Sequence, residues 1–531
     1  MQGNHHHCWS TQYQLILGRR TDIFQEAASV LVLLKEATEQ RELKKGKFLY
    51  AEAVNRGLLS TNVFLGSCFI NLYAKCGALE NAQEVFDELP LQNIVSWNAL
   101  IAGYAKHGHY TKVLTCFNQM QRAGVLPDAM TFTCLLKACG NLRAVEKGSE
   151  VHIEIVKHGH LNTNLVLGNA LIDMYAKCGA LEKARMIFNE LPTQNVVTWT
   201  TLIAGYCCHG EGEKALDLFK QMNHEGLPLD AVVLRCILKV CGSIAAVNEG
   251  KEVHAEIARK GFLNEDVTLG SALVDMYAKS GELVAAQEVF DELPVHNIVA
   301  WTALIAGYAR DGQGERAHHC FKEMKCEGLF PNSVTLLCLL KACSNFGAAD
   351  KGRMMHAEAI RQGFTGEDYI FGNALVDMYA KCGSPLNSYH VFFELHKRTV
   401  VAWTSLIAGY GQVGGHVIVF YLFNEMLREG IDPTSVTFLV LLHSCSSLGI
   451  MMEAQMYFEI MSKDYGITPS LDHYACMIHI FSQLGEFEKA LSLIGKMPLL
   501  SNRLIVWSGV LFSCGKWGNL MLGNFAFDIS V

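Results

Sequence analysis

The sequence predicts an all-α fold, a right-handed α-solenoid of stacked helical hairpins, from two regularities. The first is a long repeat, because Trp97, Trp199, Trp301 and Trp403 follow one another at intervals of 102 residues. The second is that the apolar spacing of a helix restarts three times within each interval. One hairpin cannot bury both of its apolar faces, so successive hairpins are expected to stack and to share a core.

Three units fill each interval. From Ile94 they run over 94–128, 129–164 and 165–195, with lengths of 35, 36 and 31 residues, and the next interval repeats these lengths without a gap. In the first unit, an apolar helical pattern breaks at Gly108 and a second one continues to Gly124. This pattern predicts a helix-turn-helix hairpin.

The turns and the core of the hairpins are predicted from recurring residues. A glycine closes each copy of the segment YAKCG, or YAKSG in the third copy, at Gly77, Gly179, Gly281 and Gly383. We expect these glycines to end helices with a positive φ. Recurring apolar segments such as Phe86 to Leu89 and Phe290 to Leu293 are expected in the core. Residues 411–423, with their two glycines and apolar run, are expected to be loosely packed.

Composition narrows the function classes. The chain has 531 residues, 19 cysteines and a formal net charge of −8. Its apolar runs are too short to cross a bilayer, so we expect a soluble protein without a membrane partner. No secretory signal precedes the cysteines, which indicates a reducing compartment. Residues 1–26 match no unit and, with Arg19 and Arg20, resemble an organelle transit peptide.

The units resemble pentatricopeptide repeats. The resemblance rests on SWNALIAGYAKHG (96–108), FTCLLKACGNLRAVEKGSEVH (132–152) and GNALIDMYAKCGALEKARMIFNELP (168–192). The lengths of 35, 36 and 31 residues are similar to the P, L and S triplets of the plant PLS subgroup. By this alignment, residues 27–502 hold about 14 units, and residues 503–531 resemble the start of an E-type tail.

The resemblance implies binding of single-stranded RNA with one base per repeat. On the first helix of a unit, the second, fifth and thirteenth residues lie within an arc of roughly 80° and can face one groove together. In the unit that begins at Ile94, these residues are Val95, Asn98 and Lys106. They suit contact with a base face, a base edge and a phosphate, respectively.

The same positions define the candidate RNA site in the other units. Candidate base-packing residues are Val95, Val197, Val299 and Val401. Candidate phosphate contacts are Lys75, Lys106, Lys177, Lys279, Arg310 and Lys381, a series that Cys208 and Gln412 interrupt. The alternative for these cations is a role in solubility alone. At the fifth position, P and S units carry only Asn, Thr or Ser, where packing would favour an apolar side chain.

The resemblance further implies that the fifth and last residues of a unit select the base together. Asn98 with Asp128 would favour U, and Thr200 with Asp230 would favour G. The pairs expected to favour A are Ser67 with Asn93, Ser271 with Asn297, and Thr302 with Asn332. Asn169 with Asn195 suggests a pyrimidine, whereas Asn373 with Thr399 and Thr404 with Thr434 depart from the usual pairs.

L units are expected to be spacers. Their fifth residues are Leu31, Thr133, Arg235, Leu337 and Leu439, several of which cannot hydrogen-bond a base. With the RNA 5′ end at the protein N-terminus, the predicted target core is A-U-n-Y-G-n-A-A-n-Y.

Catalytic chemistry is not predicted. The segments beginning at His152, His254 and His356 each match the H-x-E half of a zinc deaminase signature, but the chain contains no C-x-x-C to complete a metal site. We therefore expect no metal, no cofactor and no enzymatic activity.

The resemblance to the PLS subgroup favours a role in recognising sites of C-to-U RNA editing in a mitochondrion or chloroplast. A DYW-type deaminase or another editing factor would then act in trans. One alternative is a factor for RNA stabilisation, splicing or processing. A different class is a protein-binding scaffold like a tetratricopeptide array, although that array has a uniform period of 34 residues.

Overall fold

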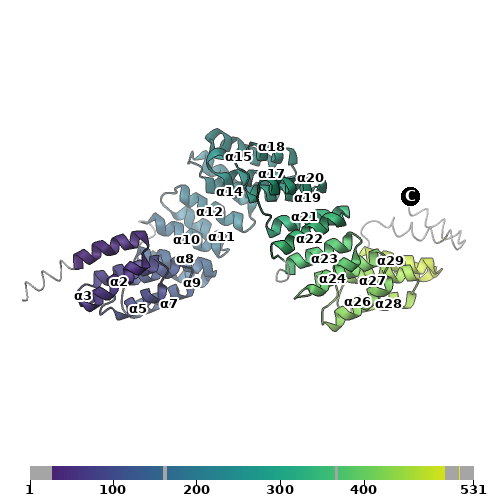
Figure 1. Ribbon diagram of the computed structural model, residues 1–531, viewed down its shortest axis with the longest axis horizontal. Coiled ribbons are helices and arrows are strands. Elements are labelled where there is room, and N and C mark those ends of the chain that lie inside the picture. The colour runs from purple at the N-terminus through teal and green to yellow at the C-terminus, as the bar shows by residue number, and fades with distance from the viewer. Residues whose placement is uncertain (1–26, 160–163, 365–368, 497–513, 515–531) are drawn as a thin grey trace, which may run out of the picture. The chain divides into compact units, whose positions relative to one another are not determined.

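The structure is a computed structural model that describes residues 27–159, 164–364, 369–496 and Cys514 (Figure 1). Every regular element in these ranges is a helix, which confirms the all-α fold. The proposed transit segment 1–26 lies outside the described residues, as does the E-like segment 503–531 apart from Cys514. The chain divides into two compact units, residues 1–253 and 254–531.

In the first unit, a helix over residues 27–40 is followed by thirteen helices. They are α2 (Leu43–Asn55), α3 (Leu58–Thr61), α4 (Val63–Lys75), α5 (Leu79–Glu88), α6 (Ile94–Lys106), α7 (Tyr110–Arg122), α8 (Ala129–Leu142), α9 (Val145–Lys157), α10 (Leu165–Lys177), α11 (Leu181–Glu190), α12 (Val196–Cys208), α13 (Gly212–His224) and α14 (Ala231–Ile244). The division between the two units falls within α15 (Val247–Lys260).

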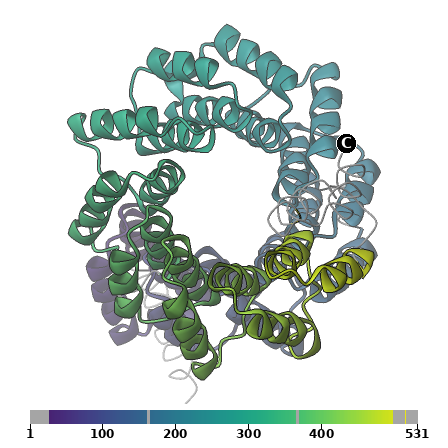
Figure 2. The ribbon, with the colours of Figure 1, turned by 90° about the vertical axis from the view of Figure 1, so that its right-hand side faces the viewer.

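The described helices of the second unit are α16 (Phe262–Glu265), α17 (Val267–Lys279), α18 (Leu283–Glu292), α19 (Ile298–Arg310), α20 (Gly314–Cys326), α21 (Ser333–Phe346), α22 (Ala349–Arg361), α23 (Tyr369–Lys381), α24 (Pro385–Glu394), α25 (Val400–Gln412), α26 (His416–Arg428), α27 (Ser435–Leu448), α28 (Met451–Lys463), α29 (Leu471–Gln483) and α30 (Phe487–Lys496). In both units, the two helices of a hairpin lie side by side (Figure 2).

Hairpins stack mainly through their first helices. In the first unit, α4 packs on α6, α6 on α8, α8 on α10, and α10 on α12. In the second unit, α17, α19, α21, α23 and α25 form the same series. The first helices therefore make a continuous layer within each unit, as a shared core requires.

The recurring tryptophans lie in this core. Trp97 on α6 packs against Phe86 on α5, with ring centroids 4.4 Å apart and the rings nearly edge to face. The next copy, Trp199, meets Phe188 in the same way at 4.7 Å. Edge-to-face pairs of this kind add about 0.5–1.5 kcal/mol to the free energy gained from burying the rings. The contact links the end of each S unit to the beginning of the following P unit.

The predicted turn glycines have the expected backbone. Gly77, Gly179, Gly281 and Gly383 follow the ends of α4, α10, α17 and α23, and their φ angles are 79°, 76°, 84° and 69°. This conformation is unfavourable for side chains with a Cβ, so the prediction of a C-terminal glycine is confirmed. The predicted core residues Phe86, Leu89, Phe290 and Leu293 are also buried.

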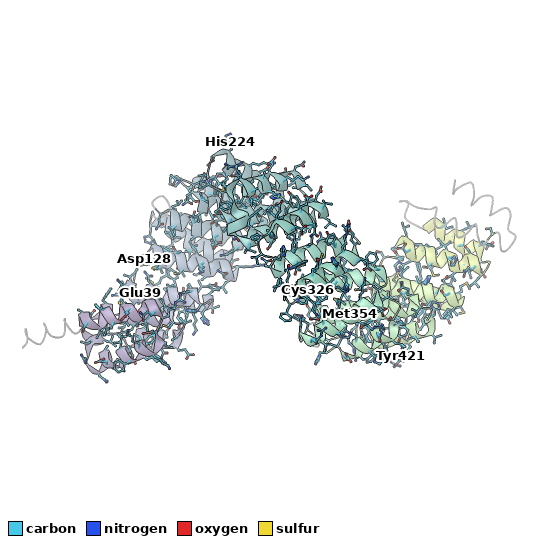
Figure 3. The ribbon with its side chains drawn as sticks, turned by 45° about the horizontal axis from the view of Figure 1, so that its top comes forward. Glu39, Asp128, His224, Cys326, Met354 and Tyr421 are labelled. Carbon is cyan, nitrogen blue, oxygen red and sulfur yellow. The ribbon has the colours of Figure 1, made fainter. Side chains whose placement is uncertain are left out.

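The expectation for residues 411–423 is wrong. Helix α26 is regular over His416–Arg428, and Val419, Leu422 and Phe423 on it are buried. Its other apolar side chains, including Val417 and Tyr421, are exposed (Figure 3). The apolar run therefore supplies a normal buried face and places its surplus apolar residues on the surface.

The histidines of the H-x-E segments have a packing role. His152 Nδ1 lies 3.1 Å from the Tyr175 hydroxyl, and His254 Nδ1 lies 3.0 Å from that of Tyr277. Each histidine therefore joins the second helix of an L unit to the tyrosine of the YAKCG or YAKSG segment that follows. Among the described residues there is no group of His, Cys, Asp or Glu that could hold a metal ion. Within the same residues, no helix is long and apolar enough to span a bilayer.

Candidate nucleic-acid interface

We define the first-helix face as the surface formed by the second, fifth, ninth and thirteenth residues of the first helices. These positions recur about one helical turn apart and share one side of the helix. Val95, Val197, Val299 and Val401 at the second position are between 48% and 60% exposed. Exposure of an apolar side chain at the same place in every P unit indicates a surface prepared for an apolar contact.

The second residue is also apolar and exposed in other units. The members are Phe64, Met130, Val166, Val232, Val334, Ile370 and Val436. The apolar series therefore continues through L and S units, and the first-helix face can contact flat, apolar ligand surfaces along both units of the chain.

The last residue of each unit caps the first helix of the next one. The Asn93 carboxamide oxygen accepts a hydrogen bond from the backbone amide of Ser96, and the Asp128 carboxylate accepts from those of Met130 and Thr131 (Figure 3). The other capping residues of this series are Asn195, Asp230, Asn297, Asn332, Thr399 and Thr434. Asn, Asp, Ser and Thr are the preferred residues at this position because their oxygen atoms accept such bonds.

The fifth residue reaches the last residue of its own unit. Asn98 Nδ2 donates to Asp128 Oδ2 at 2.9 Å, while Asp128 Oδ1 makes the cap. The corresponding contacts are 3.5 Å for Thr200 Oγ1 and Asp230 Oδ2, 3.0 Å for Ser271 Oγ and Asn297 Oδ1, and 3.1 Å for Thr399 Oγ1 and Asn373 Oδ1. The structure thus brings the predicted fifth–last pairs of these units together.

The charge state of Asp128 suits this role. Burial raises the pKa of Asp128, but hydrogen bonds from the Thr131 backbone and from the Asn98 and Thr131 side chains outweigh this effect and lower the pKa. The carboxylate is therefore ionised at neutral pH and acts only as an acceptor.

A threonine that sequence reasoning missed completes the pair. Thr131, the third residue of α8, donates its hydroxyl to Asn98 Oδ1 at 2.6 Å, and Thr198 donates in the same way to Asn169 Oδ1 at 2.8 Å. Thr335 and Thr437 contact the fifth residues Thr302 and Thr404. The signal in the sequence is the recurrence of threonine three residues after the last residue of a unit.

The fifth residues lie lower in the face than a solvent-exposed site would require. Asn98 is 8% exposed, Ser67 and Ser271 are also buried, and Thr200 and Thr302 are half-buried. Each makes hydrogen bonds within the protein, so a base would have to share or replace these bonds. Ser67 bonds to the Val63 carbonyl, and no bond joins it to Asn93 in the described residues.

The thirteenth residues form a weaker positive series than the sequence suggested. All six cations are exposed. Three of them pair with an aspartate four residues earlier on the same helix: Lys177 with Asp173 at 2.7 Å, Lys279 with Asp275 at 2.6 Å, and Lys381 with Asp377 at 2.7 Å. Within the described part of the chain, Lys75 and Lys106 have no such partner. The spacing of four residues in the DMYAK segments was the available signal.

Comparisons with known proteins agree with this architecture. The model of the PPR repeat family matches residues 92–141, 194–243, 296–345 and 398–447. A second model, described as PPR repeat, matches residues 67–94, 169–196, 271–298 and 472–500.

Among curated proteins, the chain is 34% identical over 492 residues to the mitochondrial pentatricopeptide repeat-containing protein At2g03380 of Arabidopsis thaliana, covering 92% of this chain and 70% of the relative. It is 33% identical over 492 residues to the mitochondrial At1g06140 protein of the same plant, covering 92% of this chain and 87% of the relative. Another relative from Arabidopsis thaliana, At4g33170, is 33% identical over 505 residues. That alignment covers 95% of this chain and 50% of the relative.

Among solved structures, the maize pentatricopeptide repeat protein PPR10 matches with a TM-score of 0.64 at 18% identity, over 95% of this chain and 83% of that one. The same protein in complex with an 18-nt psaJ RNA element matches with a TM-score of 0.51 at 17% identity, over 94% and 83% of the two chains. At this level of identity, the likeness concerns the fold.

Proposed function

Because the chain belongs to the pentatricopeptide repeat family, we propose that it is a sequence-specific protein for single-stranded RNA that marks sites of C-to-U editing in an organelle. The deaminase would be supplied by another protein. Membership of this repeat family agrees with the prediction that the chain is not an enzyme.

The observation that carries the proposal is the division of labour within the last residue of a unit. In Asp128, one oxygen caps α8 and the other faces Asn98. In Asn195, the carboxamide oxygen caps α12, which leaves the Nδ2 group as the second functional group. The helix therefore needs only one atom of this side chain, and the other atom can differ between units without loss of the cap.

This second atom offers a simple chemistry for base selection. A carboxylate oxygen accepts a hydrogen bond and suits the N3–H donor of uracil, whereas an amide N–H donates and suits the N3 acceptor of cytosine. The exposed second residues, Val95 and Val197 among them, would pack against the faces of adjacent bases. Together these contacts support the target core A-U-n-Y-G-n-A-A-n-Y.

The test compares binding of the purified chain to an RNA that contains this core and to a scrambled RNA, at one fixed salt concentration. We expect tighter binding to the core by at least tenfold. The Thr200→Asn variant, which keeps Asp230, should shift its preference from G toward U at the fifth nucleotide of the core. Equal affinity for both RNAs would exclude sequence-specific binding.

The editing role has a separate test. Two of the curated relatives are named as mitochondrial proteins, which supports an organellar transcript as the target. Organelle transcripts would be sequenced from a source organism that lacks the chain. A C-to-U site that is lost next to a match to the core supports editing, whereas changed transcript ends or retained introns with intact editing would instead support a role in processing or splicing.

A further inference from the structure

The ninth residue of the first helix carries a different charge in each type of unit. It is lysine in four L units, at Lys35, Lys137, Lys239 and Lys341. It is Asn71, Asp173, Asp275 or Asp377 in S units, and Ala102, Ala204, Ala306 or Ala408 in P units. A fifth L unit has His443 at this place. The positive charge of the first-helix face is therefore distributed by unit type.

These lysines lie on the same face as the proposed base contacts. The ninth residue is four positions after the fifth, which places it one turn further along the same side of the helix. Lys239 is close enough to Cys236 to lower the pKa of its thiol, and Asp230 acts on the same thiol. Lys137 and Asp128 act together on the pKa of Cys134 in the same way.

The lysines of L units are not neutralised, unlike the corresponding cations of S units. Lys137, Lys239 and Lys341 are exposed, and none of them has an ion-pair partner among the described residues. In S units, Lys177 and Lys279 are held by carboxylates at distances of 2.7 Å and 2.6 Å. An ammonium without a counter-charge gains more from a phosphate than one that must first leave an aspartate.

The remaining groups of an L unit fit a nucleotide whose base is not selected. Leu337 and Leu439 at the fifth position offer no hydrogen bond to a base edge. Met130, Val232 and Val334 at the second position are exposed and apolar. Such a unit presents an apolar contact for the face of any base and a free cation beside it.

We propose that the L units bind the RNA backbone, with Lys137, Lys239 and Lys341 each holding a phosphate next to one of the unselected nucleotides of the core. This inference rests on the proposed function. It gives the L units a binding role where sequence analysis treated them as spacers, and it places backbone contacts at every third nucleotide, between the base-selecting pairs of S and P units.

The experiment measures how RNA affinity depends on salt concentration. The triple variant Lys137→Gln, Lys239→Gln, Lys341→Gln should reduce the slope of log affinity against log salt by about 2, since each phosphate contact on a single strand contributes about 0.7. Its preference for the core over the scrambled RNA should remain, because the residues that select bases are unchanged.

Two further variants serve as controls. Lys157→Gln, Lys251→Gln and Lys322→Gln remove the same charge from exposed lysines of second helices, for which the described residues show no ion pair. This triple variant should leave the slope within about 0.5 of the wild-type value. In contrast, Asp173→Asn, Asp275→Asn and Asp377→Asn release the S-unit lysines and should increase the slope. Circular dichroism verifies that each variant retains its helical content.

The outcomes separate the two proposals. If the wild-type chain prefers the core but both lysine variants lower the slope equally, the L-unit lysines have no special role and the inference is overturned while the proposed function stands. Loss of base preference in the L-unit variant would also overturn it. If the wild-type chain does not distinguish the core from the scrambled RNA, both proposals fail.

Discussion

Replacing Asp128 with asparagine changes one functional atom at the junction of two units and leaves the shape of the side chain intact. The Oδ1 atom still caps α8 through the backbone amides of Met130 and Thr131. The other atom becomes an amide nitrogen and faces the Nδ2 group of Asn98, from which Asp128 now accepts at 2.9 Å. The variant therefore exchanges an acceptor for a donor without removing the cap.

The structure contains a reference for this variant. Asn169 and Asn195 occupy the same two positions in an S unit, where Thr198 bonds to Asn169 and Asn195 caps the following helix. The described contacts join neither amide to the other. Because Asn and Asp are similar as caps, we expect the free energy of unfolding to change by less than about 0.5 kcal/mol. In Asp128→Ala, loss of the cap costs about 1 kcal/mol and the unpaired Asn98 amide another 1–3 kcal/mol.

The assay is competition binding with four RNAs that differ only at the second nucleotide of the core. For Asp128→Asn, the preference should move from U to C by about 1–3 kcal/mol, or roughly 5- to 150-fold in Kd. Thermal unfolding of the Asn and Ala variants measures the change in stability. The reasoning is refuted if Asp128→Asn still prefers U, or if its affinity falls equally for all four RNAs.

Two further predictions concern the interior. The Cys207 thiol lowers the pKa of Cys236 to about 7 by hydrogen bonding, so alkylation of Cys236 should rise between pH 6 and 8, whereas burial raises the pKa of Cys134, at the same place in another L unit, to about 11. Cys207→Ala should remove the step near pH 7 that mass spectrometry detects; its persistence would contradict the hydrogen bond. A Cβ on Gly205 would lie 2.7 Å from that of Ala176. Gly205→Val should therefore lower unfolding stability by about 1–3 kcal/mol in denaturant titration, and an unchanged midpoint would argue against this close contact.

Much of the fold was predictable because its determinants repeat. A positive φ at Gly77 follows from the end of a helical pattern, and burial of Phe86 follows from its spacing. The pairing of Asn98 with Asp128 was expected only from the family resemblance. Geometry within one helix could not provide it, because the 30 residues between the two partners hold the rest of the hairpin.

Three features could not be obtained from the chosen positions alone. The hydroxyl of Thr131 enters from the next unit, and single-unit reasoning does not include that neighbour. The pairing of Lys177 with Asp173 depends on charge at the ninth position, which the arc of second, fifth and thirteenth residues left out. The regular packing of α26 was missed because Gly414 and Gly415 were taken as signs of disorder, although Gly414 ends a hairpin turn with a φ of 82°.

The capping role of the last residue restricts how these proteins can change their targets. A substitution at Asp128 must begin a helix as well as suit a nucleotide, so the available alphabet is close to Asn, Asp, Ser and Thr. The side chain is also held by the hairpin that follows it, through Thr131. A module moved between proteins would therefore retain its specificity only if the cut is made after the third residue of the next helix, rather than at the boundary of the repeat.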